Sequence, residues 1–444
     1  MPPRKTALWI GIATMAMVGS SRCGERGDKD MIRPAASLPE TTPWNLAELS
    51  AAPEFQWLDP ESPIRSLLYR GEPFEGRPTR VFAYYATPGA LAGDPTRDRN
   101  LPAVILLHGG GGRAFPQWVE IWAKRGYAAL AMDLAGRGPD GERLPDGGPD
   151  QDDDAKFGRI DAPVADQWPY HAVANAIRAH SLIRSFAEVD ADRTALVGIS
   201  WGGYTTCIVA GLDNRFKAAV PVYGCGFLNE NGAWVETFAK MKPEQAEKWF
   251  RLWDPSRYLG STTVPMLFVT GATEWIYTYD IHTKTCRLVK GERNLSVTPY
   301  LDHGHYFEGW RTPPMEIEIF INERLRGGTP LPKFTSCALG GKQVHAAVET
   351  SAPLTKAELH YWINAANRSH PEHREPEEKM RAAKTDWESR PARIDGNRIV
   401  ADAPPPDWAS WFLTVEDERG AVVSTELALP EDARAEKVGR RRAP

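Results

Sequence analysis

The sequence has little cysteine, no block of basic residues and no long apolar run. It holds 5 Cys in 444 residues, with no C-x-x-C and no Cys/His cluster, which excludes a disulfide-dense scaffold and argues against a structural zinc site. The formal net charge is −5 at pH 7, so nucleic acids and anionic membrane surfaces are poor candidate partners. The chain is 42% hydrophobic and 25% charged, close to the globular average, and its length suits a large domain with a smaller one.

The N-terminal residues have the layout of a secretory signal. Arg4 and Lys5 precede a short apolar run, residues 7–18, and small residues and then Cys23 follow it. The run is too short to cross a bilayer comfortably, so we expect residues 1–23 to be a signal peptide and the protein to be exported to the periplasm, the outer surface or the medium. Cys23 is a candidate for lipid modification, although Arg22 stands where a small residue is expected. In an oxidising compartment the other cysteines are candidates for disulfide pairing: Cys207, Cys225, Cys286 and Cys337.

From about residue 63 the chain alternates between apolar strands and amphipathic helices. Residues 24–62 are rich in Pro and weakly patterned, and we expect a leader or linker there. Continuous apolar strands alternating with helices predict an α/β domain over residues 63–328, with a mostly parallel sheet covered on both faces. The predicted strands are 79–85, 103–107, 128–132, 194–199, 217–223, 264–270 and 295–300. One predicted helix ends at Gly126, and the others span 170–187, 201–211, 278–289 and 314–326.

Two further segments depart from this alternation. Residues 227–260 lie between two predicted strands and are rich in Trp and Phe, which predicts a cap insertion over the carboxyl edge of the sheet. Beyond a Gly/Pro break at 327–332, residues 333–430 alternate with a short period between turn signals. This pattern predicts a small antiparallel β-sandwich of the immunoglobulin or fibronectin type.

The most specific motif is Gly198-Ile199-Ser200-Trp201-Gly202-Gly203, where a predicted strand meets a helix. In this context G-x-S-x-G is typical of a nucleophile elbow. Its glycines are needed because the sharp turn brings neighbouring backbone too close for side chains. The turn would lift the Ser200 hydroxyl above the sheet and place the Trp201 N–H at a helix N-terminus. A tight glycine turn without chemistry is the alternative.

A glycine-rich loop, residues 109–112, follows the strand that ends before His108. Such a loop lets main-chain N–H groups reach an oxyanion as it forms on an ester carbonyl. Gly110 and then Gly109 are the candidate donors, together with Trp201. We expect His108 to support the loop rather than to take part in chemistry, and a flexible turn is the alternative for the loop as a whole.

A serine nucleophile needs a base, and the base needs an orienting acid. In this fold the expected chain order is serine, acid, histidine. Glu274 lies in the turn after strand 264–270 and is the preferred acid. Asp280, early in the next helix, is the alternative.

The base is expected in the loop after strand 295–300. That loop contains Asp302-His303-Gly304-His305, which offers two histidines. His303 is preferred because Asp precedes it and Gly follows it, and His305 stays open as the alternative. The other histidine would then have a structural or substrate-contacting role. This chemistry requires no metal and no organic cofactor.

Four segments resemble the α/β-hydrolases known as acetylxylan esterases, which are related to prolyl-oligopeptidase-type hydrolases. The resemblance covers about residues 70–330 and implies serine-dependent ester hydrolysis of acetyl groups on plant polysaccharide. Members usually carry Asp in the turn where this chain has Glu274. The similar segments are Asp133–Gly138, Val197–Gly203, Pro221–Gly226 and His303–His305.

The sequence contains 16 Trp, which is unusually many. Trp275 follows the candidate acid, and Trp234 and Trp253 lie in the predicted cap, so we expect these three to contact substrate. Flat indoles suit stacking on sugar rings, and packing in the core or cap is the alternative.

Together the motifs predict a serine-dependent carboxylic ester hydrolase that acts on a small ester or an acylated polysaccharide through an acyl-enzyme. Two alternatives stay open. One is a serine peptidase or amidase of the same fold, although no propeller-like repeat precedes the catalytic region. The other is a carbohydrate-binding or scaffold protein that has lost the activity.

Overall fold

The computed structural model describes residues 30–33, 38–301, 303–304, 314–363, 387–406 and 408–429. The predicted signal peptide with Cys23, and also His305, lie outside the described residues.

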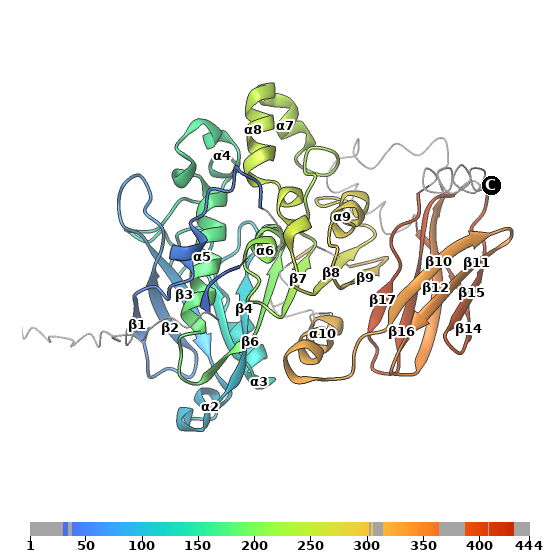
Figure 1. Ribbon diagram of the computed structural model, residues 1–444, viewed down its shortest axis with the longest axis horizontal. Coiled ribbons are helices and arrows are strands. Elements are labelled where there is room, and N and C mark those ends of the chain that lie inside the picture. The colour runs from blue at the N-terminus through green and yellow to red at the C-terminus, as the bar shows by residue number, and fades with distance from the viewer. Residues whose placement is uncertain are drawn as a thin grey trace, which may run out of the picture.

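A nine-stranded sheet forms the centre of the larger part of the molecule (Figure 1), with strand order β1-β2-β3-β5-β4-β6-β7-β8-β9. Strands β1, β2, β3 and β5 pair antiparallel, and from β5 to β9 all neighbours are parallel. The strands are β1 (Phe55–Asp59), β2 (Arg65–Arg70), β3 (Arg80–Ala86), β4 (Leu101–Leu107), β5 (Ala128–Met132), β6 (Val189–Ile199), β7 (Ala218–Val222), β8 (Met266–Gly271) and β9 (Arg293–Thr298).

Helices cover this sheet on both faces. Every residue of β5, β7 and β8 is therefore buried. The mostly parallel, doubly covered α/β sheet that the sequence predicts is confirmed. Helix α6 follows β6 directly, and its first residue is the one after Ser200. The helices are α1 (Leu46–Leu49), α2 (Pro88–Leu91), α3 (Pro116–Lys124), α4 (Asp153–Lys156), α5 (Trp168–Ile183), α6 (Trp201–Leu212), α7 (Val235–Lys240), α8 (Pro243–Trp253), α9 (Tyr279–Cys286) and α10 (Met315–Arg326).

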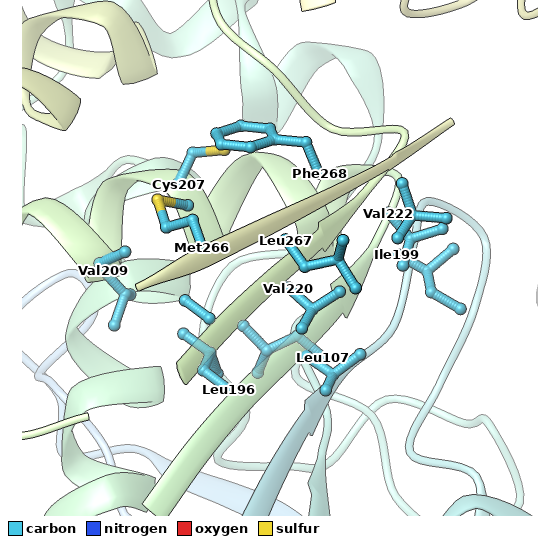
Figure 2. Packing of buried hydrophobic residues seen from close by; sticks show 14 of the residues in the cluster. Leu107, Leu196, Ile199, Cys207, Val209, Val220, Val222, Met266, Leu267 and Phe268 are labelled. Atoms are coloured by element: carbon cyan, nitrogen blue, oxygen red, sulfur yellow. The ribbon is translucent and has the colours of Figure 1, made fainter. Parts of the chain in front are cut away.

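Part of the core lies between the central strands and α6. Figure 2 shows apolar side chains of β4, β6, β7 and β8 in contact, with Cys207 and Val209 of α6 among them. Burial of this apolar area holds the strands in register, so the carboxyl ends of β4, β6, β8 and β9 are held at fixed separations. Those ends carry the candidate site residues.

The sheet begins earlier in the chain than the sequence predicts. Strand β1 lies within residues 24–62, the range expected to be a leader or linker. It is an edge strand with half-buried and exposed residues, so no apolar run marks it. The segment before it is tied to the catalytic core by the buried side chains of Trp44 and Leu49.

The C-terminal part consists of two four-stranded antiparallel sheets, ordered β10-β11-β15-β14 and β13-β12-β16-β17. It lies beside β9 at one end of the molecule (Figure 1), where Val297 N donates to Ser424 Oγ at 3.2 Å and Glu426 pairs with Arg287 and Arg293. The predicted small β domain is therefore present. Its strands are β10 (Lys333–Gly340), β11 (Gln343–Glu349), β12 (Leu354–Ile363), β13 (Trp387–Pro391), β14 (Arg393–Asp395), β15 (Arg398–Asp402), β16 (Trp408–Asp417) and β17 (Val422–Ser424).

Three of the cysteines considered for disulfides are buried free thiols: Cys207, Cys225 and Cys286. Burial raises the pKa of Cys207 and Cys225 well above the ordinary value and that of Cys286 to about 12. These three thiols are therefore protonated and packed as small apolar groups.

Within the described residues, no helix has both the length and the apolar character needed to cross a membrane.

Candidate active site

Ser200 stands in the sharp turn between β6 and α6. Its φ of 57° and ψ of −118° lie in a region that non-glycine residues rarely adopt. The Ser200 N–H donates to Val222 O at 2.8 Å, which anchors the turn to β7. The strained backbone turns the hydroxyl out of the sheet, as expected of a nucleophile elbow.

The glycines around Ser200 are required by close backbone approach. A Cβ at Gly203 would lie 2.7 Å from Val222 O, and one at Gly202 would clash with the carbonyl oxygens of Leu107 and His108. The turn thus packs against the ends of both neighbouring strands, β4 and β7. Any larger side chain would push these strands apart.

A continuous chain of hydrogen bonds joins Ser200, His303 and Glu274. Ser200 Oγ is 2.9 Å from His303 Nε2, and His303 Nδ1 is 2.8 Å from Glu274 Oε2. These distances allow the hydroxyl to donate to Nε2 and the imidazole to donate to the carboxylate. The three residues come from the carboxyl ends of β6, β8 and β9, so only folding brings them together.

The Glu274 side chain is fully buried, and both of its carboxylate oxygens accept hydrogen bonds: Oε2 from His303 and Oε1 from the main chain. Oε1 accepts main-chain N–H bonds from Ile276 at 2.7 Å and Tyr277 at 3.4 Å. A carboxylate so paired can hold one tautomer and one orientation of the imidazole. The glutamate thus reaches His303 although relatives in the resembling family usually carry aspartate here.

The alternative acid, Asp280, is engaged elsewhere. Its carboxylate accepts from Thr278 Oγ1 at 2.5 Å and from Asn231 Nδ2 at 2.9 Å, at the start of α9. It therefore supports the helix start and the loop at Asn231 rather than the imidazole. The alternative base, His305, is outside the described residues.

The glycine-rich loop after β4 lies against the residue that follows Ser200. A Cβ at Gly110 would come within 2.9 Å of Trp201 Cδ1. The Trp201 N–H is the first of α6, and N-terminal amides of a helix have no acceptor within the helix. Gly110 therefore packs against the residue that follows Ser200, which agrees with the oxyanion hypothesis. His108 is fully buried, with its Nδ1 2.7 Å from Gly109 O and its Nε2 accepting from Leu134 N at 2.8 Å, so it supports the loop as expected.

The three tryptophans expected to contact substrate have different surroundings. Trp253 has no exposed surface, and its indole N–H donates to Gln167 Oε1 at 2.7 Å, so its predicted substrate contact is corrected to a packing role. Trp234 is 8% exposed and lies 4.8 Å from the Trp201 ring and 4.6 Å from the Tyr277 ring. Trp275 is half-buried.

Sequence reasoning missed two tyrosines beside the candidate base. The Tyr223 ring stacks on His303 with centroids 4.5 Å apart, and Tyr277 lies parallel to it at 6.4 Å. Tyr223 has a positive φ of 62° and directly follows Val222, whose carbonyl oxygen accepts from Ser200 N. Tyr223 lies in the resembling segment Pro221–Gly226, but no spacing or motif gives a role to either tyrosine, because that role depends on which ring the fold places next to it.

Lys156 is a third residue without a sequence signal. Its side chain is only 8% exposed, and its ammonium lies 4.7 Å from the centre of the Trp201 ring and 2.8 Å from Asp153. Among the described residues no group of His, Cys, Asp and Glu side chains could hold a metal ion. The hydrogen-bonded residues Ser200, His303 and Glu274 offer nucleophilic attack by a serine with imidazole assistance.

Comparison with known proteins decides the superfamily. Residues 45–264 match the model of the acetyl xylan esterase (AXE1) family. The chain is an α/β-hydrolase.

The chain is similar to several solved structures. An acetyl xylan esterase from Paenibacillus sp. R4 is 24% identical, with a TM-score of 0.48 over 62% of this chain and 89% of its own. Acetyl xylan esterase 1 from Thermoanaerobacterium sp. JW/SL YS485 is 16% identical, with a TM-score of 0.47 over 63% and 93%. An acylaminoacyl peptidase from Pyrococcus horikoshii is 15% identical, with a TM-score of 0.44 over 61% of this chain and 48% of its own.

Proposed function

We propose that this α/β-hydrolase is a serine esterase that removes small acyl groups, acetyl first among them, from carbohydrate esters. The observation that carries the proposal is the hydrogen-bonded chain from Ser200 Oγ through His303 to the buried Glu274 carboxylate. The match of residues 45–264 to the acetyl xylan esterase family supports the choice of substrate class.

In the acylation half of the reaction, Ser200 Oγ attacks the ester carbonyl carbon and its proton passes to His303 Nε2. Glu274 stabilises the imidazolium that forms. Negative charge develops on the carbonyl oxygen, where the N–H groups of Trp201 and Gly110 are the donors. Each such donor is worth about 10²–10³ in rate in serine hydrolases.

The proton on Nε2 then goes to the alcohol oxygen, the bond between that oxygen and the carbonyl carbon breaks, and the acyl group stays on Ser200. Water enters next, gives a proton to His303, and attacks the acyl-enzyme. Acid leaves, and Ser200 recovers its proton from the imidazole. The rings of Trp234 and of Trp201, the residue after Ser200, pack together with centroids 4.8 Å apart, and we infer that such large rings near the nucleophile favour a small acyl group.

Hydrolysis of 4-nitrophenyl acetate and of acetylated xylan by the wild type and by Ser200→Ala tests the proposal. We expect the wild type to release acetate from both and the variant to lose on the order of 10⁶ in turnover. Equal rates in the two proteins would show that Ser200 is not the nucleophile. Hydrolysis of acylated peptides or amino-acid amides with no release of acetate from xylan would instead establish the peptidase alternative.

The choice of base has its own test. His303→Ala is expected to abolish turnover, because the imidazole that bonds to Ser200 Oγ would be missing. His305→Ala is expected to retain turnover. The reverse pattern would move the base to His305.

We propose further that the protein is exported, on the strength of the basic, apolar and small-residue pattern of residues 1–23. Expression with its native N-terminus, fractionation of the cells and N-terminal sequencing of the mature protein test this. Incorporation of labelled fatty acid that Cys23→Ser abolishes would establish the lipid anchor. A mature chain that starts at Met1 and stays in the cytosol would refute export.

A further inference from the structure

One polar group beside Ser200 has no part in the chemistry above. The Tyr277 side chain is fully buried, and its hydroxyl has no hydrogen-bond partner among the described residues. The hydroxyl does lie within range of the Ser200 side chain, which lowers the pKa of this phenol, but without the geometry of a formed hydrogen bond. A buried hydroxyl without a partner is destabilising, and folded proteins rarely keep one without a use.

The Tyr277 ring is held in place from several sides. It lies parallel to the His303 ring, 6.4 Å away, and packs on Trp234 at 4.6 Å. Its main-chain N–H donates to Glu274, the same carboxylate that orients His303. The hydroxyl therefore keeps a fixed position relative to the imidazole and to Ser200.

Sheet order shows which side of the nucleophile Tyr277 occupies. Strand β6, which ends at Ser200, lies between β4 and β7 in the sheet. Gly110 follows β4 on one side, whereas Tyr277 follows β8 and His303 follows β9 on the other. If Gly110 and Trp201 bind the oxyanion, as proposed above, the carbonyl oxygen of a bound ester would point toward the Gly110 side and its alcohol oxygen toward His303, which must protonate it.

We propose that the Tyr277 hydroxyl donates a hydrogen bond to the alcohol-side oxygen of the ester as that oxygen leaves. This assignment rests on the proposed esterase function and adds a catalytic residue to it. When the tetrahedral intermediate collapses, the electron pair of the breaking C–O bond goes to the alcohol oxygen. That oxygen takes the proton from His303 Nε2, while Tyr277 keeps its own proton and shares it in a hydrogen bond.

The ionisation of Tyr277 agrees with a donor role. Burial raises the pKa of its phenol well above the ordinary value of 10.0. The group therefore stays protonated at every pH at which the enzyme is expected to be folded. A neutral donor in a dry site strengthens as charge grows on its acceptor, so its contribution is largest for alcohols that leave as poorly stabilised alkoxides.

Tyr277→Phe tests this, because it removes the hydroxyl and keeps the ring. The matched control is Tyr258→Phe, whose buried hydroxyl already donates to Leu252 O at 2.6 Å and lies outside the site. Both variants and the wild type are assayed for kcat/KM, which reports acylation, with 4-nitrophenyl acetate and with an acetylated xylose, and for thermal unfolding.

The expected result has three parts. Tyr277→Phe loses about 10- to 100-fold in kcat/KM on the sugar acetate and less than about threefold on the nitrophenyl ester, whose leaving group needs little help. Its melting temperature is unchanged or higher, because no hydrogen bond is lost. Tyr258→Phe keeps both kcat/KM values and melts at a lower temperature, because a formed bond is lost.

Equal kcat/KM of Tyr277→Phe and wild type on the sugar acetate would overturn the inference. So would an equal loss on both esters accompanied by a lower melting temperature, which is the signature of a packing role. Failure of the wild type to hydrolyse either acetate would instead refute the esterase function itself. The two failures are therefore distinguishable.

Discussion

Replacing Glu274 by Gln should disable the enzyme without disturbing its fold. The amide has the shape of the carboxylate, and its oxygen can still accept from Ile276 N. Its NH₂ group would face His303 Nδ1, where the carboxylate oxygen lies 2.8 Å away. An imidazole that accepts at Nδ1 carries its proton on Nε2, so it cannot accept the Ser200 proton.

The size of the loss follows from the buried charge pair. With charge centres about 4 Å apart and an effective dielectric constant of about 20, the carboxylate stabilises the imidazolium by about 4 kcal/mol. At about 1.4 kcal/mol for each tenfold change in rate, kcat should fall by about 10³. Full burial of the Glu274 side chain supports a value of this order, because solvent screening is weak there.

The assay measures kcat of the wild type and of Glu274→Gln on a chromogenic acetate. Circular dichroism and thermal unfolding show whether the fold of the variant is intact. Asp280→Asn is the matched control, since that carboxylate bonds to Thr278 and Asn231 instead of the imidazole. We expect the control to keep kcat within a few-fold. A loss below tenfold in Glu274→Gln, or an equal loss in both variants, would refute the assignment of the acid.

Three further changes have defined outcomes. Gly110→Ala brings a methyl group within 2.9 Å of Trp201 Cδ1, so the loop must shift and kcat on a chromogenic acetate should fall by about 10- to 100-fold with little change in melting temperature. Asp254→Ala removes a fully buried acceptor of the main-chain N–H groups of Phe227, Leu228 and Ser256, and urea titration should show a loss of about 3 kcal/mol in the free energy of unfolding that Asp254→Asn only partly reproduces. Burial lowers the pKa of His282 to about 3, below the 6.5 of the unfolded chain, so its contribution to stability is complete above pH 6.5 and declines as the pH falls toward 3. Unfolding free energies of the wild type should thus drop by about 2 kcal/mol more between pH 7.5 and pH 5 than those of His282→Phe, and parallel pH profiles would contradict this.

The roles of single aromatic residues were hard to predict. Trp253, expected at the substrate, is fully buried with its N–H bonded to Gln167. Tyr277 and Tyr223, to which no motif gives a role, lie beside the imidazole. Aromatic residues serve cores and binding sites equally well, and only the three-dimensional neighbours of a ring show which role it has.

The amino-acid sequence alone determined the α/β class, the elbow at Ser200, the glycine loop and the chain order of the candidate nucleophile, acid and base. These features are local: apolar strand patterns, glycines forced by backbone contact, and residues placed at strand ends. Tertiary structure alone decided that Glu274 and not Asp280 reaches an imidazole, that His303 bonds to Ser200, and that β1 belongs to the sheet. Such choices depend on distances of a few ångströms between segments that are far apart in the chain. Strand pairing and core packing set these distances, and the local sequence pattern does not encode them.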